Sequence, residues 1–340
     1  MRMVAERAGV SAATVSRSLN NPKAVSPELR ARIAAVIEEI GYVPDASARA
    51  LTVKRTRTIG AIIPTVDNAM FAQGLQALQT YLASKDYLLL LSTNEYDLDV
   101  ELKQARNLVS RGIDGLILRG DVHREEVHRL LAAQNIPFVH VGVYEPEKPC
   151  PSIGVDNAAA GRAITRHLVG LGHRKVGIVA AMQRNNDRAQ ARVRGVLEVL
   201  GEAGATPPPE WFIQVNYKLD EARAAARVML TLPERPTAVV CGNDAIAYGV
   251  LLEALKLGIA VPDEVSIVGF DDLEWSRHLH PSLTTIHMPT EEIWRRAGEY
   301  LVRTLAGVPA IQHHEVDFSL VVRESTAPPP GPRDGESRRR

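Results

Sequence analysis

Histidine is the residue in this chain best suited to bind a metal or to carry a proton, so histidine spacing is considered first. In HREEVH, residues 123–128, the two histidines are five apart, whereas a zinc-binding helix needs a spacing of four to place both on one face. His313 and His314 are adjacent and would point to opposite faces of a strand. We therefore expect solvated or core histidines and predict no metal site.

Nucleotide-binding and nucleophile motifs are the next candidates for chemistry. GLGHRKVGIV, residues 170–179, has too few glycines for a dinucleotide loop and precedes a strand instead of following one. The sequence also has no G-x-S-x-G motif and no phosphate-binding loop. These observations favour a protein that is not an enzyme, and we predict no cofactor.

The stretch AERAGVSAATVSRSLN, residues 5–20, carries side chains that could contact DNA bases. Arg17 can donate two hydrogen bonds to a guanine, and Ala12 and Ala13 are small enough to contact thymine methyl groups at close approach. On a helix, Ala13, Ser16, Arg17 and Asn20 would share the outward face. That narrow face with a cation suits the DNA major groove.

Three helical stretches are predicted to position this face. Apolar residues recur at helical spacing at Val4 and Ala8, at Val15 and Leu19, and at Leu29, Ile33, Ile37 and Ile40. Gly9 permits a turn, Ser11 and Ser26 can cap the second and third helices, and Gly41 ends the third. The pattern is typical of a helix-turn-helix with a shared apolar core. A small helical hairpin with a purely structural role remains the alternative.

From residue 58 onward, strands and helices alternate. The predicted strands are TIGAIIP, YLLLLST, DGLILRG, PFVHVGV, KVGIVAA, WFIQVNY, TAVVCG and VSIVGF. Phe71, Leu75, Leu78 and Leu82 form one helical face between the first two. Such alternation favours parallel sheets with helices on both faces. The fold class is therefore α/β, with a helix-turn-helix head and two doubly wound parallel-sheet subdomains.

Charge and composition indicate where the chain acts. Residues 1–57 carry ten Lys or Arg against five Asp or Glu, while the whole chain has a formal net charge of zero. A basic head on an acidic body suggests that the head meets a polyanion, although a solvated helical surface explains the charge equally well. With two cysteines, no signal sequence and no apolar run of membrane-spanning length, we expect a cytoplasmic protein and no membrane partner.

The head segments VAERAGVSAATVSRSLN and VSPELRARIAAVIEEIGYVPDASARAL resemble the DNA-binding head of the LacI/GalR family of bacterial transcription regulators. The resemblance continues through RTIGAIIP, GVDNAAAGRAITRHLVGLGHRKVGIV, the long stretch from PTAVVCG to TTIHMP, and SLVVRES. It implies a core like that of periplasmic binding proteins. It also implies a homodimer that binds operator DNA and responds to a small-molecule effector.

The resemblance gives domain boundaries. Residues 1–43 would form the DNA-binding domain and 44–57 a hinge helix. Residues 58–155 and 288–323 would form the N-subdomain of the core, 156–287 its C-subdomain, and 324–340 a disordered tail. In the hinge, Leu51 would wedge between base pairs in the minor groove and kink the duplex. DNA contacts implied by the resemblance are Ala12, Ala13, Thr14, Ser16, Arg17, Asn20, Lys23, Ala48, Arg49 and Leu51.

The effector would bind in the cleft between the subdomains. The positions implied are Met70, Phe71, Asn94, Arg119, Asn186, Arg188, Arg192, Tyr217, Asn243 and Asp271. Arg119 and Arg188 stand where relatives that bind sugars or purines more often have neutral residues, and Gly142 stands where sugar binders commonly have an aspartate. We therefore expect an anionic effector, a carboxylate or phosphorylated metabolite. The alternative is that Arg119 or Arg188 pairs with Asp271 or Asp156, or points to solvent, and leaves a site for a neutral ligand.

The expected function is that of an effector-responsive repressor. One departure from the family pattern concerns the start, because Met3 stands where the family has an aspartate, shortly after a Ser or Thr cap. Either translation begins upstream or the head is weakened. The alternative function is thus a small-molecule-binding protein of the same core fold whose shortened head no longer binds DNA.

Overall fold

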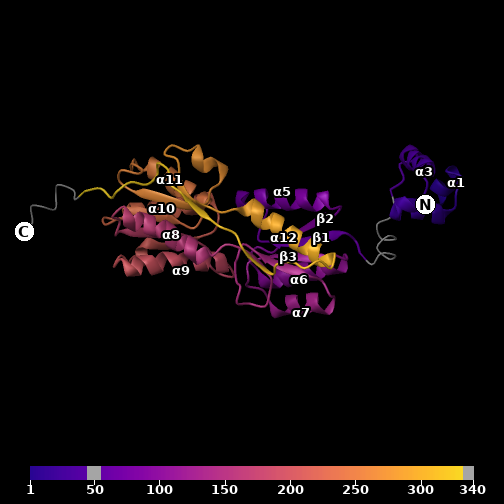
Figure 1. Ribbon diagram of the computed structural model, residues 1–340. Coiled ribbons are helices and arrows are strands. Elements are labelled where there is room, and N and C mark those ends of the chain that lie inside the picture. Colours follow the sequence, from indigo (N-terminus) through magenta and orange to yellow (C-terminus); the bar gives the residue numbers. More distant parts are fainter. Residues whose placement is uncertain (44–54, 332–340) are drawn as a thin grey trace, which may run out of the picture. The chain divides into compact units, whose positions relative to one another are not determined.

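The structure is a computed structural model that describes residues 1–43 and 55–331, except for the side chains of Asn20 and Pro22. The chain divides into two compact units, Met1–Thr56 and Arg57–Arg340 (Figure 1). None of the helices among the described residues is long and apolar enough to cross a membrane.

The first unit holds three α-helices and one short 3-10 helix. They are α1 (Arg2–Arg7), α2 (Ala12–Asn20), η1 (Pro22–Ala24) and α3 (Pro27–Glu39). The Ser11 hydroxyl accepts a hydrogen bond from the amide of Thr14 at 3.1 Å, and Ser26 caps α3 in the same way. Gly9 turns the chain after α1 with a φ of +62°, a value that favours glycine. The predicted caps and turn are confirmed.

The small core of this unit consists of apolar residues from all three helices. Its fully buried members are Val4, Ala5, Ala8, Val15 and Ile33. Partly buried neighbours such as Val10 and Leu19 pack around them. The predicted shared core is therefore confirmed, and it leaves the opposite side of α2 free for other contacts.

The second unit contains two six-stranded sheets, one in each lobe. The first sheet has the order β11-β5-β4-β3-β1-β2, and all its strand pairs are parallel. Its strands are β1 (Thr58–Ile63), β2 (Leu88–Thr93), β3 (Gly115–Arg119), β4 (Phe138–Val141), β5 (Ser152–Gly154) and β11 (His313–Glu315). Every residue of β1 is buried, as a central strand covered on both faces requires.

Helices cover both faces of the first sheet (Figure 1). These helices are α5 (Ala69–Ser84), α6 (Leu98–Ser110), α7 (Glu125–Ala133) and α12 (Thr290–Leu305). On one face, Leu78 of α5 and Trp294 of α12 pack into the main core. On the other face, Leu108 of α6 and Leu131 of α7 belong to a separate apolar cluster. The apolar face predicted for α5 is confirmed.

The second sheet has the order β12-β10-β9-β8-β6-β7. Its strands are β6 (Val176–Ala181), β7 (Phe212–Val215), β8 (Ala238–Cys241), β9 (Ser266–Asp271), β10 (Thr284–His287) and β12 (Ser319–Val321). The helices α8 (Asn157–Gly170) and α9 (Asp187–Glu202) pack on one face, and α10 (Leu219–Leu230) and α11 (Asp244–Lys256) pack on the other. Two short helices, η2 (Pro209–Trp211) and η3 (Glu274–Arg277), complete the lobe.

The last strand corrects one predicted boundary. We assigned residues 288–323 to the first lobe, but β12 pairs antiparallel with β10 in the second sheet. The chain therefore crosses between lobes a third time after β11, near residue 316, and not near residue 323. Hydrogen-bond pairing at a sheet edge outweighs sequence order here, because an unpaired edge strand leaves its backbone groups unsatisfied.

The start predicted for the disordered tail, residue 324, is also wrong. Ser325 is fully buried, and its hydroxyl donates to the carbonyl of Ile267 at 2.6 Å. The carbonyl of Ala327 accepts from the ring of His173 at 2.8 Å. Residues 325–327 are thus packed against the second sheet, while residues 332–340 lie outside the described part of the chain.

Candidate functional site

The face of α2 opposite the small core is exposed. Ala12, Ala13 and Arg17 are exposed on this helix, and Lys23 is exposed in η1. Thr14 and Ser16 are half-buried, and the Thr14 hydroxyl lies 2.9 Å from that of Ser11. Small residues next to an exposed cation match the arrangement expected for base contacts.

The structure does not describe the side chains of four predicted DNA contacts. Asn20 ends α2, but its side chain lies outside what the structure describes. Ala48, Arg49 and Leu51 also lie outside the described residues. Their assignment stays a prediction.

The predicted effector residues gather where strands end and helices begin, between the two lobes. A small cavity is lined by Met70, Phe71, Tyr96, Arg119, Arg188, Ala189, Arg192 and Tyr217. Met70 and Phe71 occupy the first turn of α5, and Arg119 ends β3. Arg188 and Arg192 lie on the first turns of α9 in the other lobe. Both lobes therefore contribute arginine to one enclosed space.

The remaining predicted residues surround this cavity without lining it. Asn186 caps α9 and donates to the hydroxyl of Tyr217 at 3.1 Å. Asn243 caps α11, and Asn94 donates to Glu101 at 2.9 Å. Asp271 ends β9 with a φ of +111°, a costly conformation for a residue other than glycine. These residues hold the walls of the cavity in place.

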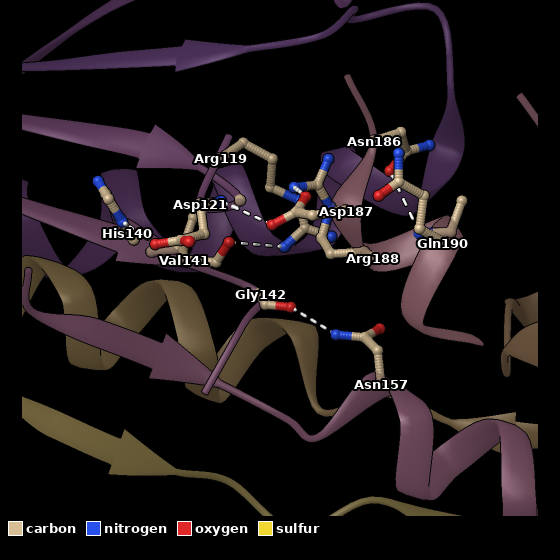
Figure 2. Close-up of polar contacts among 12 residues, drawn as sticks. Arg119, Asp121, His140, Val141, Gly142, Asn157, Asn186, Asp187, Arg188 and Gln190 are labelled. Atoms are coloured by element: carbon tan, nitrogen blue, oxygen red, sulfur yellow. Dashed lines mark hydrogen bonds and ion pairs between the residues drawn. The ribbon is translucent and has the colours of Figure 1, made fainter. Parts of the chain in front are cut away.

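The three cavity arginines have different partners. Arg188 lies 2.7 Å from the carboxylate of Asp187, and Arg192 lies 3.7 Å from Asp271. Arg119 has no carboxylate partner: it donates to the carbonyl of Val141 at 3.4 Å, and its Nε has no hydrogen-bond partner among the described residues (Figure 2). Burial, together with the nearby Arg188, lowers the pKa of Arg119 to about 9.

Two glycines make room for these arginines. A Cβ at Gly142 would lie 1.6 Å from Nη1 of Arg119, and a Cβ at Gly120 would lie 1.8 Å from Nη1 of Arg188. Both glycines also have positive φ, so a side chain there would be strained as well. The space that a side chain at residue 142 would need is thus filled by a guanidinium group.

Polar contacts join the two lobes beside the cavity. The amide of Asp121 donates to Asp187 at 2.7 Å, and Asn157 donates to the carbonyl of Gly142 at 2.9 Å (Figure 2). Asn157 also accepts from Nε of Arg192 at 3.1 Å. The residues that line the cavity are therefore tied directly to the contacts between lobes.

Sequence reasoning missed two residues of this site. Tyr96 lines the cavity and stacks on Tyr217 with ring centroids 6.3 Å apart, and burial raises its pKa. Asp187 pairs with Arg188 and bonds to the other lobe. Their positions could have indicated both residues. Tyr96 closely follows the end of β2 and Asp187 begins α9, and ligands of such sheets bind beyond the carboxyl ends of the strands.

The comparisons with known proteins agree with both units. Residues 1–45 match the bacterial regulatory proteins of the lacI family, and residues 165–326 match the periplasmic binding protein-like domain. The HTH-type transcriptional repressor PurR of Proteus mirabilis (strain HI4320) is 34% identical over 331 residues, which are 96% of each chain.

Solved structures extend the likeness to nearly the whole chain. A LacI family regulator from Silicibacter pomeroyi has 28% identity and a TM-score of 0.86, covering 96% of this chain and 98% of that one. The lac repressor dimer bound to operator and the anti-inducer ONPF has 25% identity and the same TM-score, covering 96% of this chain and 99% of that one. The chain therefore belongs to the lacI family of bacterial regulatory proteins and is a DNA-binding transcription regulator with an effector-binding core.

Proposed function

We propose that the protein is a cytoplasmic repressor that binds a pseudo-palindromic operator as a homodimer, without catalysing a reaction. The exposed face of α2, with Ala12, Ala13 and Arg17, supports this proposal because it combines a small surface with one cation. The solved lac repressor, similar over 96% of this chain, is a dimer bound to operator. A two-fold dimer reads two half-sites, and so its operator is pseudo-palindromic.

The experiment that tests DNA binding is selection of duplexes from a random library by the full-length protein. We expect an enriched sequence with two inverted half-sites and a footprint that covers both. The Leu51→Ala variant should bind that sequence more weakly and bend it less in circular-permutation assays, because the wedge is lost. If no sequence is enriched, the rival function applies, in which the core binds a small molecule and the head no longer binds DNA.

The effector is the second part of the proposal. It is a small anion, a carboxylate or a phosphorylated metabolite, held in the cavity between the lobes. The observation that supports this most is Arg119, a buried guanidinium that faces the cavity without a carboxylate partner. A buried cation of this kind favours an anionic ligand, since burial without a partner is costly.

The balance of charges around the cavity also favours an anionic ligand. Three arginines, Arg119, Arg188 and Arg192, face two carboxylates, those of Asp187 and Asp271. The alternative in which an arginine pairs with Asp156 is not favoured, because Asp156 caps α8 and pairs with Arg162 at 3.3 Å. The site retains one unmatched positive charge for a ligand.

An effector in this place would control DNA binding through the lobes. Its anionic group would contact Arg119 of one lobe and Arg188 of the other, and so would favour one separation of the lobes. In a dimer, that separation sets the spacing of the two heads. The effector and the operator would thereby change each other's affinity by the same factor.

Calorimetry against a panel of organic acids, sugar phosphates, neutral sugars and nucleobases tests the ligand class. We expect an anion to bind and the Arg119→Met variant to bind it about 10- to 100-fold more weakly, the value of a charge-assisted hydrogen bond. Arg194→Met is the matched control, since Arg194 lies on α9 and its side chain is 62% exposed. Tight binding of a neutral sugar or base, unaffected in Arg119→Met, would reject the anion.

A further inference from the structure

A group of histidines lies beside the site just described but takes no part in it. His128 is on α7, His140 is on β4, and Cys150 is in the loop before β5. One nitrogen of each histidine and the sulfur of Cys150 all lie within 4.8 Å of one another. Three separate segments thus bring two nitrogens and one sulfur, all able to bind a metal, close together.

The two imidazoles face each other through the atoms that bind metals. Nε2 of His128 lies 3.2 Å from Nε2 of His140. Two zinc-bound nitrogens at about 2.0–2.1 Å from the metal are roughly 3.3 Å apart in a tetrahedral site. The nitrogen pair therefore has the separation of two zinc ligands before any movement.

The protonation state of His140 is fixed by its other neighbour. Nδ1 of His140 lies 3.2 Å from the carboxylate of Asp121, which also pairs with Lys148. The Asp121 carboxylate accepts from Lys148 as well, and an acceptor of this kind requires Nδ1 of His140 to be the donor. Nε2 of His140 therefore carries a lone pair, as in the carboxylate–histidine–zinc arrangement.

A third imidazole packs against these two rings. The ring centroid of His123 lies 4.6 Å from that of His140 and 5.8 Å from that of His128. The third histidine, His123, is excluded as a ligand because its nitrogens contact Glu101 at 2.8 Å and the carbonyl of Gly120 at 3.1 Å.

We propose that His128, His140 and Cys150 bind one Zn²⁺ ion, with a fourth position left for water. Two imidazoles and a thiolate are the donor set that zinc prefers over magnesium or calcium. Cys150 lies in the loop before β5, and its sulfur is within 4.8 Å of the nitrogens of both histidines. The HREEVH segment contributes only His128 to this site, so its histidine spacing predicts no pair of zinc ligands.

The proposed ion would lie close to the contact between lobes. Asp121 orients His140 by its side chain and bonds to Asp187 by its amide (Figure 2). Asp187 in turn pairs with Arg188, which lines the cavity. A bound zinc ion would fix His140, and through it the side chain of Asp121, which forms the first lobe's part of this contact between lobes.

Titration of Zn²⁺ into metal-stripped, full-length protein tests the proposal. We expect one equivalent to bind, and we expect His128→Gln to weaken binding about tenfold or more. His314→Gln, which changes a histidine outside the group, should bind as the wild type does. Absence of a one-to-one zinc complex, or equal loss in both variants, would overturn the proposal.

Cobalt identifies the sulfur ligand. Bound Co²⁺ should give a thiolate-to-cobalt charge-transfer band that Cys150→Ser abolishes and that Cys241→Ala retains, because Cys241 is buried in the core of the second lobe. A second measurement needs no variant: zinc should protect Cys150 of the wild type from alkylation, as mapped by mass spectrometry. A band that survives Cys150→Ser, or alkylation that zinc does not slow, would rule out this site.

Discussion

Arg17 in the head and Arg192 in the core carry the same charged group in opposite surroundings. Arg17 is exposed on α2, whereas Arg192 is buried on α9, with Nη1 3.0 Å from the carbonyl of Gly242 and its guanidinium 4.9 Å from the ring of Phe270. The cost of desolvating Arg192 is met on folding, while Arg17 would be desolvated only when DNA arrives. We infer that the core arginine supports the fold and that the head arginine serves recognition alone.

The strongest test of this contrast removes the buried cation. Arg192→Leu should lower the free energy of unfolding by about 3–5 kcal/mol, because it leaves the buried carboxylate of Asp271 without its cation. Chemical denaturation of the full-length protein measures this change. Adding Asp271→Asn should recover part of the loss, and exposed Arg194→Leu should stay within about 0.5 kcal/mol of wild type. Equal stability of Arg192→Leu and Arg194→Leu would break the contrast.

The exposed cation should behave in the opposite way. Arg17→Ala should weaken operator binding by about 1–3 kcal/mol and relax the base preference at one base pair in each half-site. The free energy of unfolding should not change. Gel-shift titration against operator variants measures both effects. Lys23→Ala sharpens the comparison, because loss of a phosphate contact should weaken binding to all sequences alike and reduce the salt dependence. Unchanged selectivity in Arg17→Ala would show that another face reads the bases.

The smallest expected effect concerns the Ser11 cap at the start of α2, the helix assigned to base recognition. Ser11→Ala removes the hydroxyl that accepts from the Thr14 amide, so the head should lose about 1 kcal/mol of stability. Ser11→Asp should restore the lost stability, since a carboxylate can also accept from the Thr14 amide and interacts favourably with the positive end of the helix dipole. Hydrogen exchange of the amides in α2 reports the local loss. Exchange as slow in Ser11→Ala as in the wild type would mean that the cap contributes little.

Local signals explain which parts of the fold could be predicted. The helices of the head and the strands β1–β4 and β6–β9 follow from apolar spacing, caps and buried runs, each of which is visible within a few residues. The three-residue strand β12 has no such pattern, and its place in the second sheet depends on pairing with β10. Its lobe could not be assigned from the order of elements along the chain.

Some residues of the candidate site could be predicted from the sequence and others could not. The cavity arginines were predicted because the resemblance fixes their positions near strand and helix ends. Tyr96 was missed because it lies in a turn with positive φ, where side-chain direction cannot be read from spacing. The histidine group was missed because His128, His140 and Cys150 come from separate segments that only the fold brings together.

The tight fit between Gly142 and Arg119 limits how this site can change by mutation. A carboxylate placed at residue 142 would meet the guanidinium of Arg119 before it met any ligand, since even the Cβ lies 1.6 Å from Nη1. The same holds for residue 120 and Arg188. A side chain at either glycine would therefore displace the end of its arginine and would also adopt a positive φ, so a library that varies these two glycines should mostly return glycine.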